Sequence, residues 1–208
     1  FVVWMRLLAA RPGSVLWLSQ PDAAAVTNLR AQAQRLGIEA GRLVFAPRVA
    51  TPQHLANHRA ADLFLDTFDY NAHTTASDAL WAGLPVLTRQ GETFASRVAA
   101  SLLRAVDLPD LITHSTSGYE ALALELSAPG SRLAALRARL DAQRDTAPLF
   151  DTARFARHFG AAVAALWSDR LAGAARRPLQ VLEDTPGDVR VVEDAPVAAG
   201  HGVERFGR

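Results

Sequence analysis

The chain has 208 residues, half of them hydrophobic, which suits one globular domain with a short appendage. Its net charge of only +1 argues against nucleic acid as the main partner. It has no cysteine, and each of its 22 basic residues is an arginine, so disulfides, cysteine-ligated zinc and lysine chemistry are excluded. No apolar run approaches the ~20 residues of a membrane-spanning helix, and we expect a cytoplasmic protein without membrane contact.

Predicted helices and strands alternate along the first two-thirds of the chain. A helix over 1–10 is followed by a strand at 14–18, a helix at 22–36 and a strand at 43–45. The next helix begins near Thr51, the predicted N-cap, with Pro52 at the first helical position. Then come a strand at 63–66, a helix at 74–82, a strand at 85–88, a helix at 95–106 and a strand at 112–113. This order predicts an α/β fold with a Rossmann-like, mostly parallel sheet flanked by helices.

The remainder of the chain has a different pattern. It is predicted to be helical over 117–127, 131–144 and 152–167. From residue 168 onward Ala, Gly, Pro, Asp, Glu and Arg dominate, so we predict a Rossmann-like domain over 1–167 and a disordered tail over 168–208. Because the chain opens inside an amphipathic helix without a starting methionine, we expect it to be a fragment of a longer protein.

The turn between the strand at 63–66 and the helix at 74–82 is the strongest candidate for a binding site. In open α/β sheets ligands bind at the carboxyl ends of the strands, and the free amides of a helix N-terminus favour an anion there. His73, Thr74 and Thr75 add three side-chain donors at this point, which suits a pyrophosphate. The alternative is that a threonine caps the helix and His73 fills the loop.

Two further residues fit a nucleotide at the same edge. Asp78 shares a helix face with Thr74 and Thr75, so it either complements the helix dipole or accepts hydrogen bonds from two ribose hydroxyls. His54 follows the strand at 43–45, where a base would sit, and it is either a solvated side chain or a ring that stacks on uracil.

Other polar residues give weaker signals. Gly91, Thr93 and Ser96 form a second strand-to-helix turn, in which they are either plain turn and cap residues or part of the same site, and Arg97 is as well suited to a surface ion pair as to a phosphate. No metal site is predicted, because the remaining histidines have no metal-ligand spacing: His58, His114, His158 and His201. The chain has no HExxH, GxSxG or phosphate-loop motif, which excludes those protease, esterase and ATPase classes.

Several segments together resemble one enzyme family. From about residue 3 to 167 the chain is similar to the C-terminal half of the catalytic region of bacterial-type protein O-GlcNAc transferases, which are family 41 glycosyltransferases of GT-B fold with SPINDLY-like relatives. The matching segments occur in the family's order: PGSVLWL (12–18), RLVFAP (42–47), ADLFLDT (61–67), HTT (73–75), DALWAG (78–83), GETFASRVAAS (91–101) and PLF (148–150).

The resemblance implies roles for individual residues. His54 would stack on the uracil of UDP-GlcNAc, Asp78 would hold the ribose, and His73, Thr74 and Thr75 would contact the diphosphate. Val49 and Thr51 would line the base and ribose through backbone groups, although the family's ribose-contacting lysine, which falls beside Thr51, is absent here.

The resemblance also implies an activity and partners. It implies the donor-binding half of an inverting transferase that moves GlcNAc to Ser or Thr of proteins without a metal or other cofactor. The catalytic residues, the other catalytic half and the tetratricopeptide repeats that engage acceptor proteins would lie upstream of Phe1, so we expect no turnover by this chain alone. The alternatives are a protein O-fucosyl- or other hexosyltransferase of the same family, and a non-catalytic Rossmann-like binding module.

Overall fold

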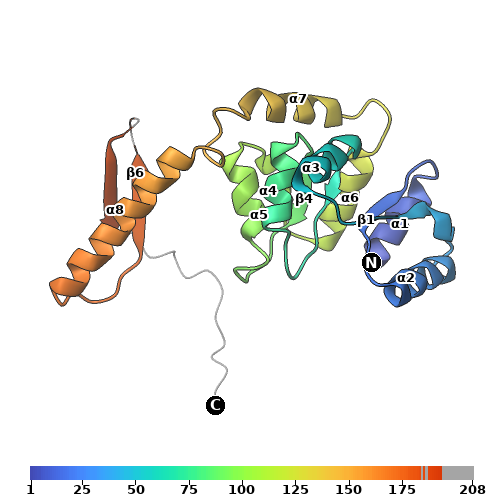
Figure 1. The fold of residues 1–208 in the computed structure, drawn as a ribbon, viewed down its shortest axis with the longest axis horizontal. Coiled ribbons are helices and arrows are strands. Elements are labelled where there is room, and N and C mark those ends of the chain that lie inside the picture. Colours follow the sequence, from blue (N-terminus) through green and yellow to red (C-terminus); the bar gives the residue numbers. More distant parts are fainter. Residues whose placement is uncertain (184, 186, 194–208) are drawn as a thin grey trace, which may run out of the picture. The chain divides into compact units, whose positions relative to one another are not determined.

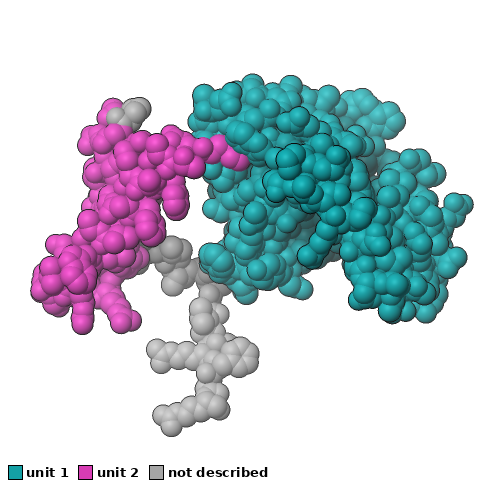
Figure 2. Space-filling model, in the orientation of Figure 1, with its two compact units in different colours: residues 1–149 teal, residues 150–208 magenta. Residues whose placement is uncertain are grey.

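The structure, a computed structural model, describes residues 1–183, 185 and 187–193, and it consists of two compact units. Unit 1 comprises residues 1–149 and unit 2 residues 150–208 (Figure 2). The sequence pattern predicts this boundary at residue 167 instead. The difference arises because the last long helix belongs to the second unit.

Unit 1 alternates strands and helices as predicted (Figure 1). Two short 3-10 helices, Ala40–Arg42 and Pro109–Leu111, lead into strands. The other elements are α1 Val2–Ala10, β1 Leu16–Ser19, α2 Ala23–Arg35, β2 Leu43–Ala46, α3 Thr51–Ala60, β3 Phe64–Leu65, α4 Thr74–Trp81, β4 Val86–Arg89, α5 Val98–Ala105, β5 Ile112–Thr113, α6 Thr116–Leu126 and α7 Leu133–Gln143.

The strands of unit 1 are parallel, which confirms the predicted α/β class, but they form two hydrogen-bonded sheets rather than one. β1 pairs with β2, with Leu16 opposite Leu43. β3, β4 and β5 form the second sheet in that order, with Phe64 opposite Val86 and Thr88 opposite Ile112. Successive strands of the second sheet are joined through α4 and α5, so their carboxyl ends lie at one edge.

Helix α1 links the two halves of this core. Met5 and Leu8 pack with residues of β1 and β2, whereas Leu7 packs with Leu87 of β4 and Tyr119 of α6. Ion pairing reinforces the second contact, because Arg6 forms two hydrogen bonds with the carboxylate of Glu120, at 2.7 and 2.5 Å. β4 is the central strand of its sheet, and Val86, Leu87 and Thr88 are buried.

Unit 2 is a long helix packed on a hairpin. α8 runs from Thr152 to Leu171 and contacts β6 (Leu179–Glu183) and β7 (Val189–Glu193), which pair antiparallel. The prediction of a disordered tail from residue 168 is therefore wrong for these segments. The rest of that predicted tail, residues 194–208, lies outside the described residues.

A cluster of charges fastens the hairpin to the helix. The Glu183 side chain is only 4% exposed and meets Arg154, Arg157 and His158 of α8 at 2.7, 3.0 and 2.9 Å. Its carboxylate also accepts a hydrogen bond from the amide of Gly187 at 2.8 Å. The Gly187 amide and then Arg157 lower the pKa of Glu183 to about 2.

We predict that Glu183→Gln loosens unit 2 in a pH-dependent way. Because the folded-state pKa lies below the ordinary value of 4.5, the stabilisation is present above pH 4.5 and is lost as the pH falls towards 2. Amide hydrogen exchange in β6, compared between variant and wild type at each pH, should be faster in the variant at neutral pH, with a difference that shrinks in acid. Glu193→Gln, at an exposed carboxylate, is the control. A difference that stays constant with pH would contradict the prediction.

Candidate functional site

The candidate site lies where β3 ends and the chain turns into α4, and a buried carboxylate organises this turn. Asp66 Oδ1 accepts hydrogen bonds from the amides of Thr67 and Ala72, at 2.8 and 2.7 Å. Asp66 Oδ2 accepts one from the Thr88 hydroxyl of β4 at 2.6 Å, and Asp66 is 1% exposed. One side chain thus fixes both ends of the loop and ties it to the central strand.

Other contacts hold the backbone around Asp66. The buried Tyr119 hydroxyl donates to the Asp66 carbonyl oxygen at 3.1 Å, and burial raises the pKa of Tyr119. The Asn71 side-chain amide donates to the Thr67 carbonyl oxygen at 2.8 Å. Arg89, at the end of β4, lies over the Phe68 ring at 4.3 Å. The loop that leads into α4 is therefore held on several sides, which preorganises the start of the helix.

Helix α4 begins with unused donors. His73 is the N-cap residue, and its side chain makes no capping hydrogen bond. The amides of Ala76 and Ser77 donate to the His73 carbonyl oxygen, whereas those of Thr74 and Thr75 have no backbone acceptor in the described part of the chain. Both threonines are exposed at this end. The alternative interpretation of a threonine cap is therefore wrong, and the hydroxyls remain available to a ligand.

The His73 ring lies between two exposed aromatic side chains. Tyr70 stacks on it with ring centroids 4.8 Å apart, and Phe94 meets it edge-on at 6.1 Å. Tyr70 and Phe94 are 67% and 76% exposed. His73 Nε2 is shielded from solvent and has no hydrogen-bond partner among the residues that the structure describes. A buried nitrogen without a partner is costly, so a polar ligand atom would complete this environment.

The structure brings His54 and Asp78 together, although they are far apart in sequence. His54 Nε2 of α3 lies 3.7 Å from Asp78 Oδ2 of α4, and their side chains are 40% and 35% exposed. Behind His54, the buried His58 ring meets it edge-on at 4.4 Å and stacks in turn on Phe64 at 6.3 Å. The sequence predicts no functional role for His58, but its ring supports that of His54. The two predicted nucleotide contacts therefore share one open edge.

Val49 and Thr51 lie just before His54 and are exposed. The predicted N-cap role of Thr51 is wrong: Ala50 is the N-cap of α3, so Thr51 and Pro52 fall at its first two positions. No side-chain hydrogen bond caps this helix. Both residues are thus on the surface, where the role expected for them would place them.

The second strand-to-helix turn lies beside the first. The amide of Asn71 donates to the carbonyl oxygen of Ala95 at 2.9 Å, which joins the two loops. Within the second turn the hydroxyls of Thr93 and Ser96 bond to each other at 2.8 Å, so they act as turn residues. A Cβ on Gly91 would approach Ser96 Oγ to 2.4 Å, which explains the glycine. Arg97 is exposed at this turn and forms no ion pair with any described residue.

The supporting residues of the site are not predicted by the sequence pattern: Asp66, Tyr119, Tyr70 and Phe94. A signal existed for Asp66, because an acidic residue directly after a buried strand lies at the functional edge of a parallel sheet. Among the described residues no group of three or more His, Asp or Glu side chains is suited to a metal ion, and no described helix is long and apolar enough to cross a membrane. That no metal or cofactor is needed stays a prediction.

We predict that Asp66→Ala destabilises unit 1 by about 1–3 kcal/mol, because it leaves buried donors without an acceptor. Asp66→Asn keeps an oxygen for the Thr67 and Ala72 amides and should cost less. Urea unfolding followed by tryptophan fluorescence measures both variants, with Asp62→Asn, at an exposed aspartate, as the control. Equal stability of Asp66→Ala and wild type would contradict the anchoring role.

The same carboxylate gives a pH dependence. Burial raises the pKa of Asp66 above its ordinary value of 3.8, against the opposing effect of its hydrogen bonds from Thr88, Ala72 and Thr67. Because the folded-state pKa is raised, the contribution of Asp66 to the free energy of unfolding is complete below pH 3.8. It is lost as the pH rises through the folded-state pKa. The stability of wild type relative to Asp66→Asn should therefore fall from acid to neutral pH.

Comparisons with known proteins agree with this architecture. The family model described as "Glycosyl transferase family 41" matches residues 1–159. The chain is 35% identical over 182 residues to a protein of Arabidopsis thaliana named "Probable UDP-N-acetylglucosamine--peptide N-acetylglucosaminyltransferase SEC", which covers 87% of this chain and 19% of that protein. It is 32% identical over 165 residues to the UDP-N-acetylglucosamine--peptide N-acetylglucosaminyltransferase of Caenorhabditis elegans, covering 79% of this chain and 14% of the relative.

A solved structure is similar throughout most of the chain. A mutant of the O-GlcNAc transferase of Thermobaculum terrenum superimposes with a TM-score of 0.79 at 29% identity, covering 84% of this chain and 34% of that one. The chain thus spans a fifth or less of the length of the two curated relatives. With a family model that matches three-quarters of its residues, this chain belongs to glycosyl transferase family 41.

Proposed function

We propose that this chain is the donor-binding half of an inverting glycosyltransferase. The chain would bind UDP-GlcNAc, and the whole enzyme would transfer GlcNAc from this donor to Ser or Thr of acceptor proteins. The observation that carries the proposal is the shared edge on which the His54 and Asp78 side chains face each other beside the open N-terminus of α4. The family membership and the names of the relatives support the reaction class.

The diphosphate is assigned to the start of α4. Thr74 and Thr75 offer amides without backbone acceptors and exposed hydroxyls, and His73 offers a ring nitrogen without a partner in the described chain. These groups lie at the positive end of the helix dipole, which favours a negatively charged ligand. Because the Asp66 network holds the turn, the donors need little reorganisation when charge develops on the ligand.

The nucleoside is assigned to the facing side chains of α3 and α4. The His54 ring presents a surface suited to stacking on a base, supported from behind by His58. Asp78 is placed to accept hydrogen bonds from ribose hydroxyls. Their contact at 3.7 Å contributes little to stability, because even fully charged exposed pairs are worth at most about 1 kcal/mol. Ligand binding therefore explains better than a stabilising contact why these two polar side chains converge on an open edge.

The chemistry follows from this arrangement. In inverting transfer the acceptor hydroxyl oxygen bonds to the anomeric carbon while the bond from that carbon to the β-phosphate oxygen breaks, and the electron pair leaves on UDP. The α4 donors would stabilise that leaving diphosphate. We expect the base that takes the hydroxyl proton, and the repeats that select acceptor proteins, to lie outside this chain, which would act in the cytoplasm.

Calorimetric titration with UDP tests the donor site. We predict saturable binding to the 208-residue chain, weakened by His54→Ala and unchanged by His114→Ala, a matched exposed histidine. A parallel titration with GDP tests the alternative that this chain belongs to a transferase of the same family with a different nucleotide-sugar donor: a uridine site should prefer UDP to GDP. Absence of heat with UDP and GDP at about millimolar ligand would favour the non-catalytic module instead.

The role of Asp78 has its own test. Wild type should bind UDP about tenfold or more tightly than 2′,3′-dideoxy-UDP, because hydrogen bonds to a charged group are lost with the hydroxyls. Asp78→Ala should remove this difference and leave inorganic pyrophosphate affinity unchanged. Asp62→Ala, at an exposed aspartate outside the site, is the control. Equal losses for UDP and pyrophosphate would rule out a ribose contact.

A further inference from the structure

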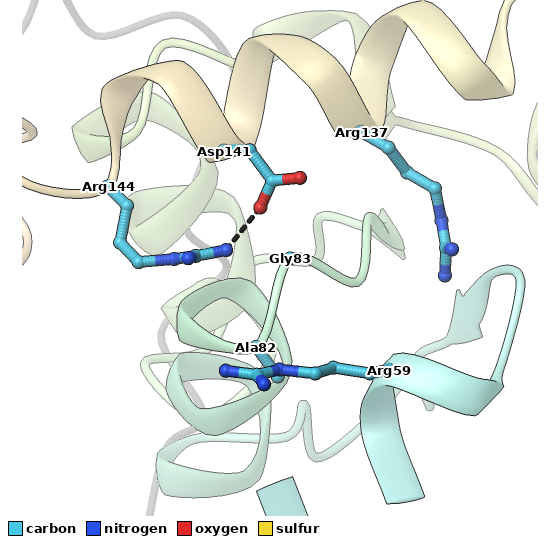
Figure 3. Close-up of a pocket in the computed structure, with 6 residues that line it drawn as sticks. All are labelled: Arg59, Ala82, Gly83, Arg137, Asp141 and Arg144. Atoms are coloured by element: carbon cyan, nitrogen blue, oxygen red, sulfur yellow. Dashed lines mark hydrogen bonds and ion pairs between the residues drawn. The ribbon is translucent and has the colours of Figure 1, made fainter. Parts of the chain in front are cut away.

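A polar cavity lies in unit 1, towards the C-terminal ends of α3 and α4, where α7 crosses them (Figure 3). Its volume is about 370 Å³. The lining residues are Arg59 of α3, Ala82 and Gly83 after α4, and Arg137, Asp141 and Arg144 of the α7 segment. None of them belongs to the nucleotide site proposed above.

The cavity has more positive than negative groups. Three guanidinium groups line it against one carboxylate, Asp141, which pairs with Arg144. Arg59 is exposed, and its side chain forms neither a hydrogen bond nor an ion pair with any described residue. Arg137 donates through Nη2 to the carbonyl oxygen of Ala61 and has no carboxylate partner in the described structure. Like charges gathered in one cavity repel each other, so an anion would stabilise this arrangement.

Buried donors add a second reason. Arg137 Nε and Arg144 Nε are shielded from solvent, and neither has a hydrogen-bond partner among the described residues. Guanidinium N–H groups in this situation are costly unless an acceptor is supplied. Arg139, on the same helix, differs because Asp107 and Asp110 both contact its guanidinium group. The arginines that face the cavity are thus less neutralised than a neighbour that faces away.

Gly83 keeps the cavity open. Its φ is +84°, and a Cβ there would approach Asp141 Oδ1 to 2.7 Å and Arg144 Nη2 to 3.2 Å. Figure 3 shows the Arg59 side chain passing along Ala82, with Arg137 and Arg144 reaching down from α7 on either side of Asp141. Capping of helix ends explains the Arg137 contact to Ala61, but it leaves Arg59 and the two Nε groups unexplained.

We propose that this cavity binds a small oxyanion, a phosphate or a phosphate monoester, through Arg59, Arg137 and Arg144. Guanidinium groups suit this ligand because each presents several N–H donors in a planar fork that matches phosphate oxygens. The inference is independent of nucleotide binding, since it rests on different residues.

The test is a titration of the 208-residue chain with inorganic phosphate, after saturation with UDP and at ionic strength held constant with sodium chloride. The ¹H–¹⁵N resonances of the Arg137 and Arg144 Nε groups should shift and saturate, with a Kd of about a millimolar. Glycerol 3-phosphate in a parallel titration separates a monoester ligand from free phosphate. The same phosphate titration is repeated without UDP. Phosphate binding at this cavity can then be measured even if UDP does not bind to the nucleotide site.

Two variants of opposite sign make the result specific. Arg59→Gln should weaken phosphate binding about threefold, and Asp141→Asn should strengthen it by a similar factor, because each changes one charge at the cavity. Arg35→Gln, at an exposed arginine on α2, should have no effect. Shifts that do not saturate below about 20 mM, or an affinity that Asp141→Asn leaves unchanged or weakens, would overturn the proposal.

Discussion

The candidate site depends on one buried carboxylate. At the point where β3 ends, the Asp66 carboxylate accepts hydrogen bonds from two loop amides and one strand hydroxyl. These hydrogen bonds, rather than a side-chain cap, determine how the chain enters α4. Burying this group is unfavourable for its ionised form, which is why its pKa is raised. The hydrogen bonds that the carboxylate accepts from Thr88, Ala72 and Thr67 oppose this cost and hold the turn, so that the first turn of α4 keeps its donors free for a ligand.

The two turns at this edge are coupled through the backbone. The hydrogen bond from Asn71 to Ala95 links the α4 turn to the turn that precedes α5, and the Thr93 and Ser96 hydroxyls close that second turn on itself. The second turn therefore acts as a wall for the first. Because of this placement, the Phe94 ring of the second turn contacts the His73 ring edge-on. A displacement of either loop would alter the surroundings of His73.

Local patterns predicted most of unit 1, whereas long-range contacts escaped them. The alternation of apolar runs and turn residues placed α4 and its His73 end correctly, but β2 and β3 lie in different sheets, so strand pairing alone does not bring His54 to Asp78. Their 3.7 Å approach, and the support of His54 by His58, depend on packing between α3 and α4 that no single segment encodes. The β6–β7 hairpin was missed because Glu183 finds its partners across 25 or more residues, while local composition there is typical of disorder.

The absence of lysine makes the distribution of guanidinium groups informative. Some arginines have clear structural partners: Arg6 pairs with Glu120, and Arg42 donates to the backbone oxygens of Ser14 and Arg11. Arg97 and Arg59 are different, because neither forms an ion pair within the described residues and each lies beside a cluster of donors. One cluster is the α4 turn and the other is the cavity under α7. Because an arginine remains charged at any physiological pH, Arg97 and Arg59 keep a positive charge at these two places that no carboxylate of the described residues pairs with, and an anion could neutralise it.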